Sequence, residues 1–351
     1  MSDELYMKRC LELAEMGNGE VSPNPLVGCV IVSGGKIIGE GFHQKYGAAH
    51  AEVNAVNAAF TNYGDTAADL LKQATAYVSL EPCAHFGKTP PCADLLIRHQ
   101  IKKVVIGNRD PFPDVNGKGI EKLLNAGIEV VTGILEKECR YVNRRFFTRI
   151  ARNRPYIILK WARTANGYFA PKDILQKWIS GPLAKKLVHK WRTEEDAILV
   201  GKKTAMADNP RLNAREWPGN NPVRIVIDRN LEVPASYHVY DDQAKTIIIN
   251  ELKTDVINNI HFVSMEDMQY YLPQKIAYQL YLMDIQSIII EGGADILNQF
   301  ISSGLWDEAR VFNSSESWDT GIYSPQINGR ITAVTKVDRD QLTIYENVVN
   351  K

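Results

Sequence analysis

The first 140 or so residues switch repeatedly between helical and strand-like spacing of apolar positions. A helix is predicted over residues 3–16, and residues 27–32 and 36–41 flank Ser33-Gly34-Gly35 with the spacing of a β-hairpin. The same periodicities predict further helices over 49–60, 92–99 and 119–125, and further strands over 75–80, 103–107 and 128–133. This alternation is typical of an α/β layered domain.

After residue 155 the same rhythm begins again. A β-rich run at 156–161 is followed by four apolar runs, at 197–200, 223–227, 246–249 and 287–290, which predict a parallel or mixed sheet. Crossover helices are predicted over 182–192 and 294–303, the second ending at Gly304. The predicted fold class is therefore α/β in both halves of the chain.

Six arginines lie between residues 140 and 154, just before the second cycle begins. A run of like charge has no geometry of its own, so a solvated linker is preferred here over an anion-binding site. The predicted domains are residues 1–149 and 150–351. The length agrees, because 351 residues correspond to about two domains of ~150 residues each.

Composition and charge narrow the classes of function. Hydrophobic residues make up 45% and charged residues 23%, which excludes wholesale disorder. Because 41 basic residues balance 41 acidic ones, neither nucleic acid nor a membrane surface is predicted as a partner. Neither a secretory signal nor a membrane-length apolar run is present. Five cysteines, an odd number, favour a reducing, cytoplasmic location over a disulfide framework.

One histidine and two cysteines give the strongest chemical signal. His50 is followed by Cys83 and then by Cys92, the cysteines lying within PCAHFGKTPPC. Three protein ligands leave a tetrahedral zinc one open position for water, whereas a structural site fills all four. His50 and Cys92 are predicted at helix starts, where the helix dipole favours a thiolate. The pattern therefore predicts a catalytic zinc ion, and the other cysteines are predicted to be packing residues: Cys10, Cys29 and Cys139.

Glu52 stands two residues after the histidine, too close to act comfortably as a further ligand. It is well placed to move protons between water and a leaving nitrogen, the division of labour found in zinc deaminases. Those enzymes carry H-x-E followed by P-C-x-x-C. Here eight residues separate the two cysteines, which is a departure from that spacing.

The long insertion between the cysteines resembles that of the bifunctional riboflavin-biosynthesis deaminase/reductase family, and three further motifs match in order: Asn24-Pro25-Leu26-Val27-Gly28, Asp110-Pro111 and Gly117-Lys118-Gly119. The resemblance covers nearly the whole chain. It implies an N-terminal cytidine-deaminase-like three-layer domain and a C-terminal dihydrofolate-reductase-like nucleotide-binding domain. It also implies zinc-dependent deamination of 2,5-diamino-6-ribosylamino-4(3H)-pyrimidinone 5′-phosphate, followed by NADPH-dependent reduction of the ribosyl group to ribityl.

In the deaminase half, the resemblance supports His50, Cys83 and Cys92 as ligands and Glu52 as the proton shuttle. It implies substrate contacts from four further residues: Asn24, His43, His85 and Lys88. His85 and Lys88 lie in the insertion between the two cysteines, where an exposed loop is the alternative interpretation.

In the second half, no G-x-G-x-x-G follows a predicted strand. The strand at 287–290 does run into Glu291-Gly292-Gly293 and a helix, a geometry that can present backbone N–H groups to phosphate. Taken alone, such a glycine pair is more often a tight turn. The resemblance implies NADPH contacts from these residues: Ala162, Trp178, Thr204, Asp208, Gly293, Ala294, Asp295, Ile296, Leu297, Asn298 and Gln299.

The resemblance also implies substrate contacts in the second half from Gln176, Arg192, Leu212, Arg215 and Glu291. An arginine pair suits a sugar phosphate dianion, and a carboxylate suits ribosyl hydroxyls. The chain departs from the family at Gln176, which replaces the usual serine, and at Asn166 in the turn Thr164-Ala165-Asn166-Gly167.

Arg229 is another departure, because the family usually has a small hydroxyl residue after the aspartate at this position. We hypothesise that its guanidinium grips the 2′-phosphate of NADPH, where a hydroxyl would make a single bond. An ordinary surface arginine explains the residue equally well.

Two alternative functions are weighed against this interpretation. A deaminase of other nucleosides, nucleotides or tRNA adenosine would use the same zinc and glutamate, but it predicts C-x-x-C spacing and, for RNA, a basic surface. It also leaves the second half without a task. A binding module with a structural zinc, or with an inactive reductase half, would have no use for Glu52. The oligomeric state, including a homo-oligomer, is left open.

Overall fold

The structure is a computed structural model that describes residues 2–84, 90–113, 115–172 and 179–348. The chain divides into two compact units, Met1–Arg152 and Asn153–Lys351. Both units are α/β, in agreement with the predicted fold class. Within the described segments, no helix has the length and apolar character needed to cross a bilayer.

The N-terminal unit is built on a five-stranded sheet with the strand order β2-β1-β3-β4-β5. β1 pairs antiparallel with β2 and β3, whereas β3, β4 and β5 run parallel. The strands are β1 (Gly28–Ser33), β2 (Lys36–Phe42), β3 (Thr75–Leu80), β4 (Lys103–Asn108) and β5 (Glu129–Thr132).

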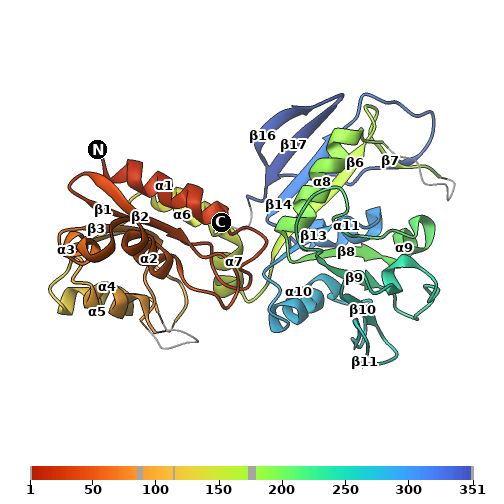
Figure 1. Ribbon diagram of the computed structural model, residues 1–351. Helices are drawn as coiled ribbons and strands as arrows, with labels where there is room; N and C mark the ends of the chain where they lie inside the picture. Colours follow the sequence, from red (N-terminus) through yellow and green to blue (C-terminus); the bar gives the residue numbers. More distant parts are fainter. Residues whose placement is uncertain (1, 85–89, 114, 173–178, 349–351) are drawn as a thin grey trace. The chain divides into compact units, whose positions relative to one another are not determined.

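Alternate strand residues of this sheet feed two separate hydrophobic cores. Cys29 and Ile31 point into one core, and Val30 and Val32 point into the other. The first core is covered by α2 (Ala51–Tyr63), α3 (Ala67–Lys72), α4 (Cys92–Arg98) and α5 (Lys118–Asn125), and the second by α1 (Asp3–Glu15) and α6 (Glu136–Val142). Figure 1 shows these helices on opposite sides of the sheet, so the predicted three-layer arrangement is confirmed.

The arginine-rich segment is not a bare linker, and that part of the sequence interpretation is wrong. Residues 136–142 form α6, and the following residues form α7 (Arg144–Arg152), so the boundary expected after residue 149 falls inside a helix. Phe146 and Phe147 are buried against Leu80. Five of the six arginines lie on these helices, and the two aromatic residues anchor the segment to the unit, a packing effect that charge alone does not reveal.

The C-terminal unit contains a ten-stranded sheet with the order β11-β12-β10-β9-β8-β13-β6-β14-β17-β16. The strands from β12 to β14 in this order run parallel, and β11, β17 and β16 pair antiparallel at the edges. The strands are β6 (Tyr156–Arg163), β8 (Ala197–Gly201), β9 (Val223–Ile227), β10 (Thr246–Asn250), β11 (Asp255–Ile257), β12 (Ile260–Ser264), β13 (Ser287–Ile290), β14 (Glu308–Asn313), β16 (Arg330–Val337) and β17 (Asp340–Glu346). A separate pair joins β7 (Tyr168–Ala170) to β15 (Ile322–Tyr323).

Helices cover both faces of this larger sheet. α10 (Leu272–Leu282) and α11 (Ala294–Ser302) pack on the face to which Leu159 and Ile290 point. α8 (Pro182–Glu194) and α9 (Lys202–Asp208) pack on the opposite face, against Ile289 and Ile198. The predicted mixed sheet with crossover helices is therefore present, and the sheet carries additional strands and helices that the sequence pattern did not predict.

Close helix packing in the N-terminal unit depends on glycine. A Cβ atom on Gly28 would lie 1.9 Å from the carbonyl oxygen of Cys10 in α1, and one on Gly39 would lie 2.1 Å from the carbonyl oxygen of Ala55 in α2. Both contacts are with helix backbone, which cannot move aside as a flexible side chain can. The absence of side chains at these positions lets helices lie directly on the hairpin that precedes the zinc motif.

The substitution Gly28→Ala should destabilise the N-terminal unit by about 2 kcal/mol or more, because α1 would have to shift off the sheet. Thermal unfolding followed by circular dichroism measures this. The matched control is Gly34→Asn, since Gly34 has a φ of 57° and open space around it, and asparagine tolerates that conformation. Equal melting temperatures for both variants would contradict the packing argument.

Candidate active sites

Three elements of the N-terminal unit bring the predicted zinc ligands together. His50 immediately precedes α2, Cys83 follows β3, and Cys92 is the first residue of α4. Their ligand atoms all lie within 4.8 Å of one another. The Nδ1 atom of His50 is 3.2 Å from Sγ of Cys92 and 3.7 Å from Sγ of Cys83.

These distances fit one tetrahedral metal ion. Zinc bonds of ~2.0–2.3 Å at tetrahedral angles separate neighbouring ligand atoms by about 3.3–3.8 Å. The soft nitrogen and sulfur donors also suit zinc better than a hard cation. His50, Cys83 and Cys92 could therefore hold a zinc ion with one coordination position left for water.

The residues around Cys83 favour its thiolate form over the thiol. The Cys92 thiol beside Cys83 holds the pKa of Cys83 at about 4, and the contact with His50 acts in the same direction. The backbone N–H of Cys92 also donates to Sγ of Cys83, at 3.3 Å. Since a cysteine binds metal as the thiolate, the lowered pKa of Cys83 favours the form that a zinc ion requires, whereas the same contact and burial raise the pKa of Cys92.

Glu52 lies in the first turn of α2 and is almost fully buried, with 3% of its surface exposed. Burial raises the pKa of this carboxyl group, and the nearby Cys83 acts in the same direction. A carboxyl group with a raised pKa can both accept and return a proton near neutral pH. The position and the environment of Glu52 are those that a proton shuttle needs.

Two predicted substrate residues lie beside this cluster. The side-chain amide of Asn24 donates to Nε2 of His43, at 3.1 Å, when Nδ1 of His43 donates to the carbonyl oxygen of Ala49, also at 3.1 Å. The His43 ring meets the His50 ring edge-on, with centroids 5.3 Å apart. Burial lowers the pKa of His43, which favours this neutral form. His85 and Lys88 lie outside the described residues.

Glu81 is a buried residue that sequence reasoning did not assign to the site. Its carboxylate accepts hydrogen bonds from the backbone N–H groups of Asp110, Gly117, Gly119 and Ile120, at 3.0–3.3 Å. These donors belong to the loop before α5 and to its first turn. Glu81 therefore ties that loop to the segment that carries Cys83. Its place directly before Pro82-Cys83 was the only available signal.

A cavity of about 410 Å³ lies in the C-terminal unit, where the neighbouring parallel strands β6, β13 and β8 reach their carboxyl ends. Ligands commonly bind at this edge of an open α/β sheet. The structure brings seven of the predicted residues to the cavity wall: Ala162, Thr204, Asp208, Arg192, Leu212, Arg215 and Glu291.

A largely buried ion pair lies in the wall of this cavity. Arg192 of α8 donates to both carboxylate oxygens of Glu291, at 3.3 and 2.8 Å. Burial tends to raise the pKa of Glu291, but Arg192 and Lys160 hold it at about 2. Glu291 therefore remains a carboxylate, ready to accept hydrogen bonds. Burial also lowers the pKa of Lys160, which lines the same cavity.

The glycine pair before α11 has a structural role that the phosphate-cradle interpretation did not include. A Cβ atom on Gly292 would lie 2.6 Å from the backbone of β8, at Val200 and Gly201, so this glycine permits close packing of β13 on β8. The backbone N–H of Gly293 donates to the hydroxyl of Thr204, at 2.8 Å. Thr204 thus links the start of α11 to α9 at the rim of the cavity.

Six further predicted cofactor residues, from Ala294 to Gln299, lie on α11, and none of them is among the described residues that line the cavity. Leu297 is fully buried in the core below α11, so its side chain is not available to a cofactor. Asp295 pairs at the surface with Lys203. Two further predicted residues, Trp178 and Gln176, lie outside the described residues.

Arg229 follows β9 and donates to a carboxylate oxygen of Glu251, at 2.8 Å. A second contact reaches Gln269, and the arginine side chain is 39% exposed. It does not line the cavity, at least within the part of the chain that the structure describes. In the structure, Arg229 is therefore a surface residue in an ion pair.

Two family models match the chain. The Cytidine and deoxycytidylate deaminase zinc-binding region matches residues 1–108, and the RibD C-terminal domain matches residues 155–315. The riboflavin biosynthesis protein RibD of Aquifex aeolicus (strain VF5) is 42% identical over 324 residues, covering 91% of this chain and 89% of that protein. The chain belongs to the RibD family.

Other members of the RibD family support the assignment over the full chain. RibD of Escherichia coli (strain K12) is 36% identical over 328 residues, covering 89% of this chain and 87% of that protein. The solved structure of a diaminohydroxyphosphoribosylaminopyrimidine deaminase/5-amino-6-(5-phosphoribosylamino)uracil reductase from Thermotoga maritima has a TM-score of 0.89 and 36% identity, covering 98% of both chains. A RibD structure from Acinetobacter baumannii has a TM-score of 0.88, with 31% identity and 98% coverage of both chains.

The predicted fold and function are therefore confirmed. The chain is an enzyme of riboflavin biosynthesis with a deaminase half and a reductase half. The deaminase half carries a zinc-binding region with a His-Cys-Cys cluster, and the RibD C-terminal domain is consistent with NADPH.

His189 is a second residue that the sequence interpretation missed. It lies on α8 between Lys185 and Arg192, at the spacing of one helix face, and it lines the cavity. Burial, followed by the charges of Arg192 and Arg215, lowers its pKa to about 4. His189 is therefore neutral at physiological pH.

This lowered pKa predicts a pH dependence of stability. The unfolded chain protonates this histidine near its ordinary pKa of 6.5, and the folded chain does so only near 4. The stability that His189 contributes is fully present above pH 6.5 and is lost as the pH falls toward 4. His189→Gln should flatten this part of the profile. The urea midpoint is measured by tryptophan fluorescence, which reports on the C-terminal unit because all six tryptophans follow residue 152. Parallel profiles for variant and wild type would contradict the prediction.

Proposed function

We propose that this chain deaminates 2,5-diamino-6-ribosylamino-4(3H)-pyrimidinone 5′-phosphate and then reduces the ribosyl group of the product to ribityl with NADPH. The observation that carries the first half is the three-ligand His50, Cys83 and Cys92 cluster beside buried Glu52. The order of the two steps and the substrate are supported by the name of the similar enzyme from Thermotoga maritima.

In the deamination, His50, Cys83 and Cys92 would hold the zinc ion. When bound, zinc acts as a Lewis acid that makes the attacking water a better nucleophile. Glu52 accepts a proton from this water and delivers a proton to the departing nitrogen. A C–O bond forms at the ring carbon, the C–N bond breaks, and ammonia leaves. His43 stands beside His50 and is bonded to Asn24, and these two side chains would orient the pyrimidine.

In the reduction, the cavity of the C-terminal unit would hold the ribosyl phosphate. NADPH supplies the hydride for C1′ of the opened ribose. Arg192 and Arg215 would bind the phosphate, since guanidinium groups match phosphate geometry. Glu291, held as a carboxylate, would accept hydrogen bonds from ribosyl hydroxyls. Ala162, Thr204 and Asp208 line the cavity and would approach the cofactor, as would the backbone at the start of α11.

The proposal includes a domain boundary and a location. The deaminase site belongs to the first unit and the reductase cavity to the second. A reducing cytoplasm would keep Cys83 and Cys92 as free thiols that can bind metal. That nucleic acid and membranes are not partners stays a prediction, and homo-oligomerisation stays open.

The test of the deaminase half is Glu52→Gln. Ammonia release should fall by about 10³-fold or more, because a general acid–base group is lost. Zinc content, measured by atomic absorption, should equal that of wild type, because Glu52 is not one of the three ligands. Glu121→Gln, at an exposed position of α5, is the matched control and should retain full activity. Undiminished ammonia release from Glu52→Gln would refute the proposed role and favour a structural zinc.

The test of the Arg229 hypothesis is cofactor discrimination. If Arg229 leaves Glu251 to bind the 2′-phosphate, Arg229→Ala should raise the KM for NADPH by about tenfold while that for NADH stays constant. Glu251→Gln, which releases the arginine from its ion pair, should lower the KM for NADPH. Equal effects of Arg229→Ala on NADPH and NADH would show that the residue is an ordinary surface arginine.

A further inference from the structure

Both arginines of the proposed phosphate site are held by one residue, Asn213. The guanidinium of Arg215 donates from Nη1 to the side-chain oxygen of Asn213, at 3.1 Å. The guanidinium of Arg192 donates from Nη1 to the backbone carbonyl oxygen of Asn213, also at 3.1 Å. Asn213 is 7% exposed, and it is not itself among the described residues that line the cavity. It therefore stands behind the two cations.

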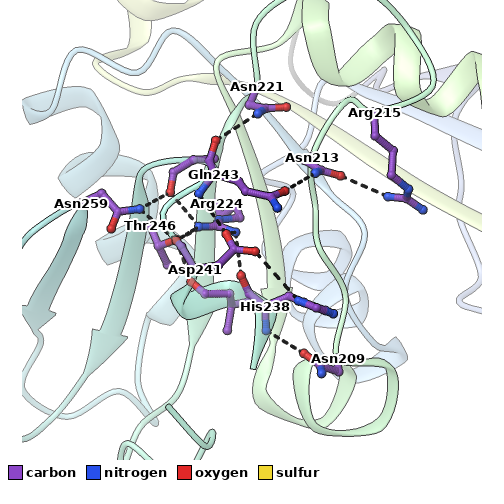
Figure 2. A network of polar contacts seen from close by, with 12 residues as sticks. Asn209, Asn213, Arg215, Asn221, Arg224, His238, Asp241, Gln243, Thr246 and Asn259 are labelled. Atoms are coloured by element: carbon purple, nitrogen blue, oxygen red, sulfur yellow. Dashed lines mark hydrogen bonds and ion pairs between the residues drawn. The ribbon is translucent and has the colours of Figure 1, made fainter. Parts of the chain in front are cut away.

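The side chain of Asn213 is held between Arg215 and Gln243. The side-chain amide of Asn213 donates to Oε1 of Gln243, at 2.9 Å. Rotating the Asn213 amide by 180° would place its NH2 group against the guanidinium of Arg215 and its oxygen against that of Gln243. The contact with Arg215 would be repulsive because a guanidinium carries only donors, so Arg215 sets the orientation of the amide and Gln243 accepts from its NH2 group. Figure 2 shows Asn213 between Gln243 and Arg215.

Gln243 in turn belongs to a loop that a buried arginine holds in place. Arg224 is completely buried and makes five hydrogen bonds, at 2.7–2.9 Å. Its acceptors are the Thr246 hydroxyl, a carboxylate oxygen of Asp241, and the carbonyl oxygens of His238, Asp241 and Ala244 (Figure 2).

Asn221 adds a second connection between this loop and the arginine segment. Its side-chain amide donates to the carbonyl oxygen of Gln243, at 3.1 Å, and its side-chain oxygen accepts from the backbone N–H of Ala214, at 2.9 Å. Residues 213 and 214 are thus joined to the loop at Gln243 by two separate hydrogen-bonded connections. The segment that carries Arg215 has little freedom to move.

We infer that Asn213, held by Gln243, is a positioning residue that sets Arg215 and Arg192 for the phosphate of the reductase substrate. The inference rests on the proposed function, in which these arginines bind that phosphate. Glu291 offsets the charge of Arg192, but the two guanidinium groups still repel one another. The two oxygens of Asn213 offset part of this repulsion and hold both guanidinium groups in place. Ordering these groups therefore costs less free energy when the phosphate binds.

The test compares two substrates that differ only in the phosphate: 5-amino-6-(5-phosphoribosylamino)uracil and its dephosphorylated counterpart. Reduction is followed as NADPH oxidation for wild type and Asn213→Ala. The variant should raise the KM for the phosphorylated substrate by about tenfold, the size expected when one hydrogen bond to a charged group is lost. For the dephosphorylated substrate, kcat/KM should change by less than about twofold.

Variants of Gln243 provide a second, independent measurement. Gln243→Leu removes the acceptor for Asn213 and should raise the KM for the phosphorylated substrate in the same direction. Gln243→Glu keeps an acceptor oxygen and should behave more like wild type. Asn230→Ala is the control, because Asn230 makes an exposed contact with Glu232 and does not line the cavity. If Asn213→Ala lowers the melting temperature, the KM values of the two Gln243 variants still test whether Asn213 positions the arginines.

A double-mutant comparison separates positioning from general damage. In an Arg215→Ala background, Asn213→Ala should add less than about twofold to the KM, because its side chain acts through Arg215. Full additivity, or an equal loss on both substrates, would overturn the inference. A wild-type enzyme that reduces neither substrate would instead overturn the proposed function, and this inference with it.

Discussion

A charge buried in a protein must be matched where it stands, and this constraint shapes both units. In the N-terminal unit, the Glu81 carboxylate is surrounded by four backbone N–H groups. In the C-terminal unit, the Arg224 guanidinium is surrounded by five acceptors. Each charge thereby holds together a loop whose own backbone makes only a few turn hydrogen bonds. The loop at Glu81 adjoins Cys83, and the loop at Arg224 reaches Asn213.

The sequence was most informative where chemistry is concentrated in a short motif. His50, Glu52, Cys83 and Cys92 combine unusual residue types with helix starts, and the structure brings the three ligands within 4.8 Å. Most apolar strands before residue 291 were also predicted close to their observed bounds, whereas the buried strand β14 was not predicted. β16 was not, because all but two of its residues are exposed and it shows no alternation of apolar positions. α7 was missed because its arginines conceal the two buried phenylalanines.

Residues that act through others had no comparable signal. Asn213 and Gln243 are common polar residues, thirty positions apart, and only the fold makes them partners. His189 carries no motif, although its spacing to Lys185 and Arg192 on α8 places all three on one helix face. Gly292 was singled out, but its closest constraint is the backbone of β8. A glycine pair in a sequence cannot distinguish space needed by a ligand from space needed by a neighbouring strand.

The two sites treat their buried carboxyl groups in opposite ways, and this difference follows from the partners each group receives. Glu52 is buried beside thiol ligands, and its pKa is raised, so it can take up and release a proton. Glu291 is also largely buried, with 11% of its side chain exposed, but Arg192 and Lys160 hold its pKa at about 2. A group with so low a pKa is a poor proton carrier and a permanent hydrogen-bond acceptor. Burial alone therefore does not define a catalytic acid; the sign of the nearest charge decides whether a buried carboxyl group moves protons or binds hydroxyls.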